Sequence, residues 1–223
     1  MHPEPDDRTT DLAGKVLLRI SALHGLVLAL VFASEVVEYQ QLTFETAVEA
    51  NAVSDAFFDS ERFEHETTAQ IRSALRRYLE ISANTEWTRL GEGQGLHPDA
   101  WLAWDEAYKA ALDLIPTNPR QEALRNNMLA KIHLIAENRD LREHHAETSL
   151  NNLFWVAAVA GVFLIAIGFY TFPPKRENLI LLSAYSAYTG LILFTIYAMS
   201  NPFVSPAALN PVLFEQLIEE IDG

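Results

Sequence analysis

Two long uncharged stretches near the C-terminal end of the chain constrain its fold more than any other feature. Residues 150–172 carry no charged side chain, and neither do residues 179–200. Each stretch has roughly the 20 residues that a helix needs to cross a hydrocarbon core about 30 Å thick. A short polar turn with two prolines, residues 173–178, separates them. Because lipid offers no partner to backbone polar groups, the pattern predicts a transmembrane helical hairpin over residues 148–200.

A third apolar stretch predicts a further span over residues 16–38. Lys15 and Arg19 lie at its start, where their side chains can reach the lipid headgroups. A basic start, an apolar run and the triplet Val31-Phe32-Ala33 are also typical of a cleaved signal peptide. The helical pattern, however, continues well beyond this triplet without Gly or Pro. This continuity favours a retained membrane helix.

The remaining residues predict a helical segment outside the membrane. Residues 39–147 hold most of the acids and bases, and the pattern predicts helices over 62–82, over 99–114 with Asp99 as the cap, and over 120–147. Residues 1–15 are polar and predicted to be disordered, and residues 201–223 form an acidic C-terminal tail. The predicted fold class is an all-α membrane protein with three transmembrane helices. The first two spans are expected to run on as long helices into the soluble segment.

Basic residues near the ends of the spans predict an orientation in the lipid bilayer. With three spans, the pairs Lys15/Arg19 and Lys175/Arg176 lie on one side, which the positive-inside rule makes cytoplasmic. The N-terminus is then cytoplasmic and residues 39–147 lie outside a bacterial inner or plasma membrane. Arg139 and Arg142, which precede the second span on the opposite side, count against this orientation.

The composition excludes several classes of function. The net charge of −14 and the interleaving of bases with acids argue against nucleic acid as a partner. The absence of cysteine excludes disulfides, thiolate zinc sites and thiol nucleophiles. No hydrolase, nucleotide-binding or redox motif is present, so we expect neither an enzyme nor a cofactor. No metal site is predicted, because the adjacent His144 and His145 point in different directions on a helix.

Four glutamates on one face of the first helix form an acidic stripe: Glu35, Glu38, Glu45 and Glu49. If several copies placed this face around an axis, the stripe would form a vestibule that favours inorganic cations at a pore mouth. The alternative is a solvated face, or a set of partners for Arg139 and Arg142 on the antiparallel helix. The stripe therefore predicts either an ion path or interhelical pairing.

Polar residues inside or beside the spans are the other candidates. Asn151 and Asn152 begin the second span and are expected to line a pore, to hydrogen-bond between helices or to cap the span at the membrane interface. His24 lies within the first span, where ionisable groups are rare and often functional. The alternative for His24 is a neutral imidazole that hydrogen-bonds to another helix.

An ordered set of residues resembles a known family. Along the chain the set comprises Glu49-Ala50, Tyr78, Glu86-Trp87, Arg139-x-x-Arg142, an apolar hairpin, Asn201-Pro202-Phe203, Pro211 and Phe214. Over residues 15 to 218 this order is similar to that of bestrophin-like membrane proteins of unknown function found in bacteria and plants. Two features depart from the family and from bestrophins proper. Val204-Ser205 stand where a glycine is common, and the acidic calcium-binding cluster that follows Asn-Pro-Phe in bestrophins is absent.

The resemblance implies a homo-oligomeric, channel-like assembly. Bestrophins form pentameric ion channels, which conduct anions in animals and cations in some bacterial relatives. We therefore expect a homo-oligomeric ion channel or channel-like protein, with cation preference indicated by the acidic stripe. The alternative is a membrane-anchored sensor or interaction protein, which would bind a ligand or partner through the extramembrane helices. Its binding features would be the glycine-rich loop at residues 91–98 and the tryptophans Trp87, Trp101 and Trp104.

Overall fold

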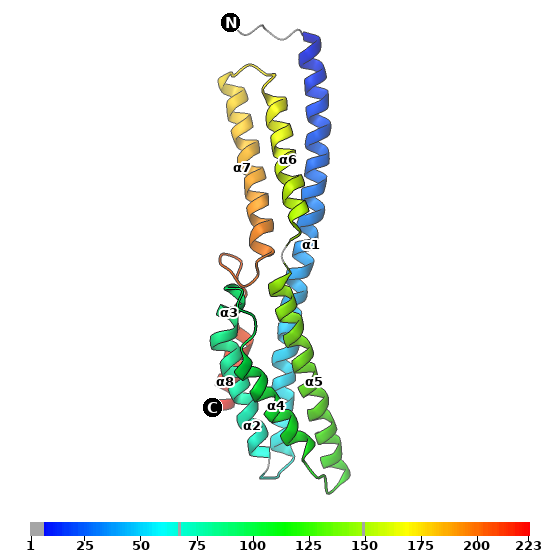
Figure 1. Cartoon of the computed structure of the whole chain (residues 1–223), viewed down its shortest axis with the longest axis vertical. Coiled ribbons are helices and arrows are strands. Elements are labelled where there is room, and N and C mark those ends of the chain that lie inside the picture. Colours follow the sequence, from blue (N-terminus) through cyan, green and yellow to red (C-terminus); the bar gives the residue numbers. More distant parts are fainter. Residues whose placement is uncertain (1–6, 67, 149) are drawn as a thin grey trace. The chain divides into compact units, whose positions relative to one another are not determined.

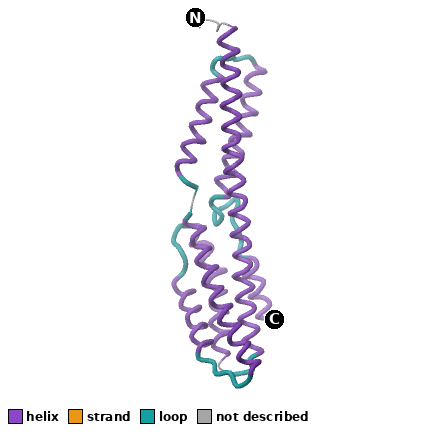
Figure 2. Tube along the Cα trace, turned by 90° about the vertical axis from the view of Figure 1, so that its right-hand side faces the viewer, coloured by secondary structure: helices purple, strands orange, loops and turns teal. Residues whose placement is uncertain are grey.

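The described part of the chain is built from helices joined by loops (Figure 2). The computed structural model describes residues 7–66, 68–148 and 150–223, with side chains from Asp11 onward, and no strand occurs among these residues. The chain divides into two compact units. The membrane unit holds the described residues up to Glu38 together with Leu150–Ser200, and the extramembrane unit holds the described residues of Tyr39–Ser149 and Asn201–Gly223.

Three helical stretches are long and apolar enough to cross a membrane, which confirms the predicted fold class. They are Asp11–Arg62, Arg176–Met199 and the stretch Pro119–Phe169, in which the helix is interrupted before Asn152. The helices are α1 (Asp7–Arg62), α2 (Thr68–Ile81), the π-helix η1 (Ser82–Glu86), α3 (Trp87–Gly91), α4 (Pro98–Leu112), α5 (Pro119–Glu147), α6 (Asn152–Phe169), α7 (Arg176–Met199) and α8 (Val212–Asp222). All of them except η1 are labelled in Figure 1. As predicted, the first span is one end of a long helix, because α1 has no break between Asp7 and Arg62.

The second span differs from the prediction. The backbone is not helical at Thr148, Leu150 and Asn151, so α5 and α6 are separate helices. Asn151 supplies the physical reason, because its side chain accepts a hydrogen bond from the Leu153 N–H at 2.8 Å and caps a new helix.

Two other local predictions are corrected. Residues 7–15, expected to be disordered, form the start of α1, and an i,i+4 ion pair between Lys15 and Asp11 supports this helix; residues 1–6 lie outside the described range. The cap of α4 is His97 and not Asp99: the imidazole Nδ1 accepts a hydrogen bond from the Asp99 N–H at 3.1 Å. Pro98 then occupies the first turn, where its missing N–H costs nothing.

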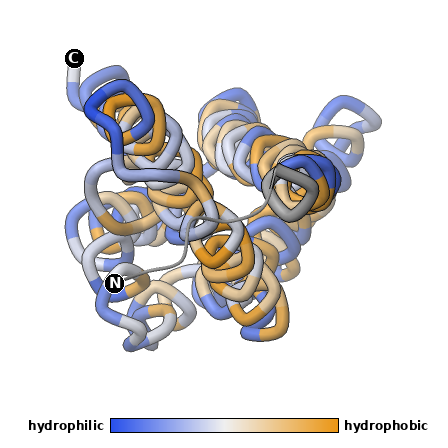
Figure 3. The backbone as a smooth tube through the Cα atoms, turned by 90° about the horizontal axis from the view of Figure 1, so that it is seen from above, coloured by the Kyte–Doolittle hydropathy of each residue, from blue (hydrophilic) through white to orange (hydrophobic). Residues whose placement is uncertain are grey.

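In the membrane unit, α1, α6 and α7 each contribute one residue to a small buried core of Leu28, Ala158 and Ile196. Most of the apolar side chains around this core are exposed, which suits helices surrounded by lipid. The hydropathy colouring of Figure 3 shows hydrophobic residues interleaved with hydrophilic ones along the helices of the chain. Glycine allows α6 to approach α1 closely, since a Cβ on Gly161 would lie 2.1 Å from Nδ1 of His24.

The extramembrane unit has a larger core, to which α1, α2, η1, α3, α4, α5 and α8 all contribute. Helix α2 contributes the stripe Ile71, Leu75, Tyr78 and Leu79, which is buried as its spacing predicts. Trp87 and Trp104 are buried in this core, whereas Trp101 is 42% exposed. The tryptophans therefore divide into two core residues and one surface residue.

Candidate functional site

A buried ion cluster lies in the extramembrane unit and joins four helical elements. It comprises Glu49 of α1, Tyr78 of α2, Ser82 and Glu86 of η1, and Arg139 and Arg142 of α5. Arg142 bridges the two carboxylates: its Nη2 lies 3.1 Å from Oε1 of Glu49 and 2.8 Å from Oε2 of Glu86. The Tyr78 hydroxyl donates to the same oxygen of Glu49. Two acids and two guanidinium groups thus balance their charge out of contact with water.

Glu86 is the most heavily bonded member of the cluster. Its Oε1 accepts from Nη2 of Arg139 at 2.6 Å and from the backbone N–H of His97 at 2.8 Å. Its Oε2 accepts from Arg142 and, at 3.3 Å, from the Ser82 hydroxyl. Glu86 therefore fixes both arginines and the start of α4 at once.

The π-helix η1 carries Ser82 at its first position and Glu86 at its last. A π-turn inserts one extra residue into a helix and shifts the side chains that follow it, and such turns are frequent at functional sites. Ser82 and Glu86 both reach the cluster from this turn, and Trp87 follows immediately as the first residue of α3.

Aromatic rings surround the guanidinium of Arg142. Its Cζ lies 4.5 Å from the ring centroid of Trp87 and 5.7 Å from that of Phe214. Trp87 also makes edge-to-face contacts with Phe214 at 5.2 Å and with Phe203 at 6.2 Å. The rings attract the cation and exclude water from it. The cluster is thus enclosed by residues from the segment that follows the third span in the chain.

The environment shifts the pKa of each carboxylate in a different direction. Burial raises the pKa of Glu49, although Arg142 and the Tyr78 hydroxyl oppose the shift. Burial would also raise the pKa of Glu86, but Arg142 and Arg139 outweigh it, and the pKa of Glu86 lies below its ordinary value of 4.5. Burial raises the pKa of Tyr78 as well, which keeps its hydroxyl a hydrogen-bond donor.

Several buried polar atoms of the cluster have no hydrogen-bond partner among the described residues. They are Oε2 of Glu49, Nε of Arg139, Nε and Nη1 of Arg142, and Nε1 of Trp87. Buried polar groups are rarely left unpaired in native proteins. The cluster is therefore an unusually polar centre for a helical core, and removal of one charged partner should be costly.

The structure places the four acids of the predicted stripe in three different environments. Glu49 is wholly buried and paired with Arg142. Glu45 is buried, and its Oε2 lies 3.1 Å from Nε2 of His145 on α5. Glu38 is exposed, whereas Glu35 is 5% exposed and lacks an ion pair or hydrogen bond to any described residue. The stripe is thus divided between interhelical pairing in the extramembrane unit and two unpaired acids in the membrane unit.

The other predicted residues have local structural partners. Asn151 caps α6, and Asn152 is the exposed first residue of that helix. After α7, the carbonyl of Asn201 accepts the Val204 N–H at 3.0 Å, and that of Pro202 accepts the Leu209 N–H at 2.8 Å. Phe203 packs on Trp87, and its carbonyl approaches Gly91 so closely that a Cβ there would lie 2.6 Å away.

The sequence predicts part of the cluster. It indicates pairing of Glu49 with Arg139 and Arg142, and the structure brings these three residues together. It did not predict Ser82 as a site residue, and it noted Tyr78 and Glu86 only within the family resemblance. For Glu86, the sequence signal is its place in the pair Glu86-Trp87 of the family resemblance. The sequence holds no comparable signal for Ser82. No group of three His, Asp or Glu side chains in the described part of the chain could hold a metal ion.

Comparisons with known proteins give a match to a protein family. No curated protein and no solved structure matches the chain. A family model described as a bestrophin-like domain matches residues 1–213 of the 223. The residues that carry the resemblance at Glu49, Tyr78, Glu86, Trp87, Arg139, Arg142, Phe203 and Phe214 converge on the cluster described above. The chain is therefore a member of the bestrophin-like family and, at a coarse level, a channel-like membrane protein.

Proposed function

We propose that this protein is the subunit of a homo-oligomeric ion channel with a preference for cations. The observation that carries the proposal is Glu35, a carboxylate at the end of the first span that is 5% exposed and has no ion pair or hydrogen bond to a described residue. An ionisable residue at such a depth is costly and commonly marks an ion path. Glu38, three residues on, is exposed on the same helix.

The acids of the stripe do not contribute equally to this proposal. Glu49 pairs with Arg142, which compensates its charge within the chain, and Glu45 has a partner in His145 of α5. Glu35 and Glu38 have no such partner and can act on a passing ion. We therefore assign the cation preference to these two residues.

Exposed small residues on α7 support assembly with further copies of the chain. Gly190 has no atom within 4 Å of the position its Cβ would take. Other small residues exposed on this helix are Ser183, Ala184, Ser186 and Ala187. Small residues allow close helix packing in lipid, where the hydrophobic effect does not drive association. An oligomer would cover this surface and place the unpaired acids around an axis.

Reconstitution of the purified protein in liposomes tests the proposal. Under a KCl gradient, a cation-preferring channel gives a reversal potential of the sign expected for K⁺. Glu35→Gln and Glu38→Gln should each move the reversal potential toward zero, because a neutral amide no longer favours cations. Glu61→Gln, an exposed acid at the other end of the same helix, is the matched control and should leave the potential unchanged.

Two results would contradict the proposal. Folded, oligomeric protein that conducts no ions would exclude channel function. Currents with unchanged reversal potential in Glu35→Gln and Glu38→Gln would exclude the assignment of selectivity to these acids.

A further inference from the structure

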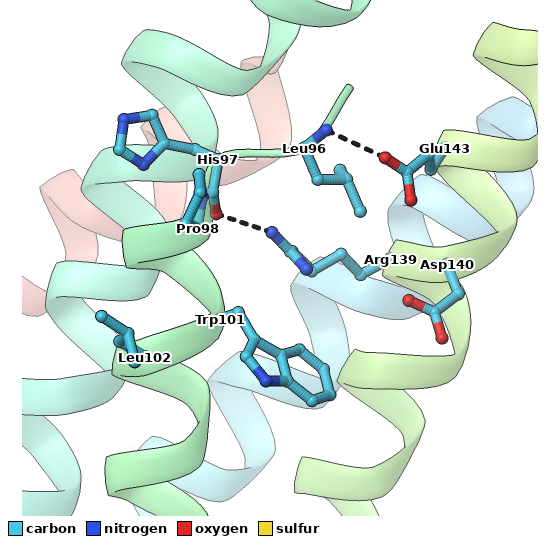
Figure 4. A pocket seen from close by; sticks show the side chains of 8 residues that line it. All are labelled: Leu96, His97, Pro98, Trp101, Leu102, Arg139, Asp140 and Glu143. Carbon is cyan, nitrogen blue, oxygen red and sulfur yellow. Dashed lines mark hydrogen bonds between the residues drawn. The ribbon is translucent and has the colours of Figure 1, made fainter. Parts of the chain in front are cut away.

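An open pocket of about 480 Å³ lies in the extramembrane unit between α4 and α5 (Figure 4). We call it the α4–α5 pocket. Trp101 and Leu102 of α4 and Leu96 of the preceding loop give it apolar walls. Asp140 and Glu143 line it from α5, and Arg139 lies between them and His97. The volume falls within the range of small-molecule sites, which are mostly apolar with a few polar groups.

The aromatic wall of the pocket is fixed in place. Trp101 stacks on Trp104 with ring centroids 4.4 Å apart and planes 18° apart, and Trp104 stacks in turn on Tyr108 at 5.4 Å. Trp104 is held by a hydrogen bond from its Nε1 to the carbonyl of Ile132 at 2.6 Å. Trp101, which is 42% exposed, lines the pocket, and the guanidinium Cζ of Arg139 lies over its ring at 5.9 Å from the centroid.

The charge of the pocket favours a cation. Asp140 is exposed and has neither an ion pair nor a hydrogen bond to a described residue. Glu143 accepts only the Leu96 N–H, at 3.0 Å, and has no basic partner in the described chain. Asp140 and Glu143 lie three residues apart and so share a face of α5.

The nearby arginine does not neutralise these acids. Nη2 of Arg139 is already bonded to Glu86 at 2.6 Å and to the carbonyl of His97 at 3.0 Å. Its Nε is buried and lacks a partner among the described residues, so it is not accessible to a ligand in the open pocket. The pocket thus combines two carboxylates that have no basic partner with apolar walls.

We propose that the α4–α5 pocket binds an organic amine. Its ammonium group binds Asp140 and Glu143, and its hydrocarbon body lies against Trp101, Leu96 and Leu102. Charged hydrogen bonds to these two carboxylates favour this class over neutral or anionic molecules. The proposal rests on the pocket alone and does not depend on ion conduction.

Three probes with the same ring test the proposal on the full-length protein in detergent. Tyramine carries an ammonium group, tyrosol a hydroxyl group and 4-hydroxyphenylacetate a carboxylate at the equivalent position. Isothermal titration calorimetry should detect binding of tyramine and much weaker or no binding of the other two. Asp140→Asn should weaken tyramine binding about tenfold, because it removes one charged hydrogen bond.

Two further variants complete the test. Glu137→Gln removes an exposed acid from the same helix outside the pocket and should leave tyramine binding unchanged. Trp101→Ala should weaken tyramine binding. If this substitution disturbs the aromatic stack, the Asp140→Asn variant alone tests the proposal. The proposal is overturned if tyramine does not bind, if tyrosol binds equally well, or if Asp140→Asn and Glu137→Gln behave alike.

Discussion

Arg142 illustrates how a single charged residue can be retained inside an apolar core. A guanidinium group loses much hydration on burial, and here Glu49 and Glu86 restore part of that free energy through direct ion pairs. Trp87 and Phe214 add cation–π attraction. Arginine suits this position better than lysine, because its planar group can bridge two carboxylates and stack on rings simultaneously.

Replacement of Arg142 by methionine should lower the free energy of unfolding by about 3–5 kcal/mol, because Glu49 and Glu86 would stay buried without their shared partner. Thermal unfolding of the purified protein in detergent measures the change. Arg76→Met is the matched control: Arg76 pairs with Glu80 and Asp222 at the surface, so its loss should cost less than about 1 kcal/mol. Equal losses in the two variants would contradict the role assigned to Arg142.

The lowered pKa of Glu86 predicts a pH dependence of stability. The folded state binds the Glu86 proton less tightly than the unfolded state does. The ionised carboxylate therefore stabilises the fold at pH values above 4.5, the ordinary pKa of this group. This stabilisation is lost as the pH falls through the lowered pKa. Glu86→Gln should therefore flatten the acid side of the curve of melting temperature against pH. Glu61→Gln, at an exposed position, should leave the shape of the curve unchanged.

At the scale of elements, glycines determine how closely α1 and α6 pack. A Cβ on Gly161 would lie 2.1 Å from Nδ1 of His24, and a Cβ on Gly168 would lie 2.7 Å from Cδ1 of Leu17. The two glycines are seven residues apart and thus lie on nearly the same face of α6. Replacement of either glycine by alanine should push the two helices apart, even though alanine has the higher helix propensity.

Gly161→Ala should accordingly destabilise the membrane unit, even though alanine is the better helix former by about 1 kcal/mol. Gly25→Ala on α1, where no atom lies within 4 Å of the added Cβ, is the control and should be neutral or stabilising. The melting temperature in detergent reports both effects. His24→Ala combined with Gly161→Ala should restore stability, because it removes the atoms that clash; failure of this rescue would exclude the proposed contact.

The sequence predicts the helices better than it predicts which residues of different helices contact one another. The spans follow from the length of their apolar runs, and the stripe of α2 follows from helical periodicity. The ion cluster joins Glu49 to Arg142 across 93 residues, and only an approximate pairing could be inferred. The π-turn at Ser82–Glu86 had no clear sequence signal, and Asn151, a residue common at helix caps, was the only signal for the break before α6. Both depend on tertiary packing and on competing caps, which periodicity does not describe.

At the scale of the whole molecule, the chain alternates between apolar spans and a charged helical segment. The exposed Lys175 and Arg176 lie in the turn between α6 and α7, at the start of the third span. The positive-inside rule assigns such a turn to the cytoplasm. We therefore propose that this turn lies in the cytoplasm and that the loop after α1 lies on the opposite, outer side of the membrane.

Cysteine labelling tests this orientation without background, because the natural chain contains no cysteine. Glu61→Cys and Arg176→Cys change two exposed positions that the proposal assigns to opposite sides. A membrane-impermeant maleimide should label the first variant in intact cells and the second only after permeabilisation, because the bilayer blocks the reagent. The reverse pattern would place the extramembrane unit in the cytoplasm, and the α4–α5 pocket would then meet amines of the cell interior.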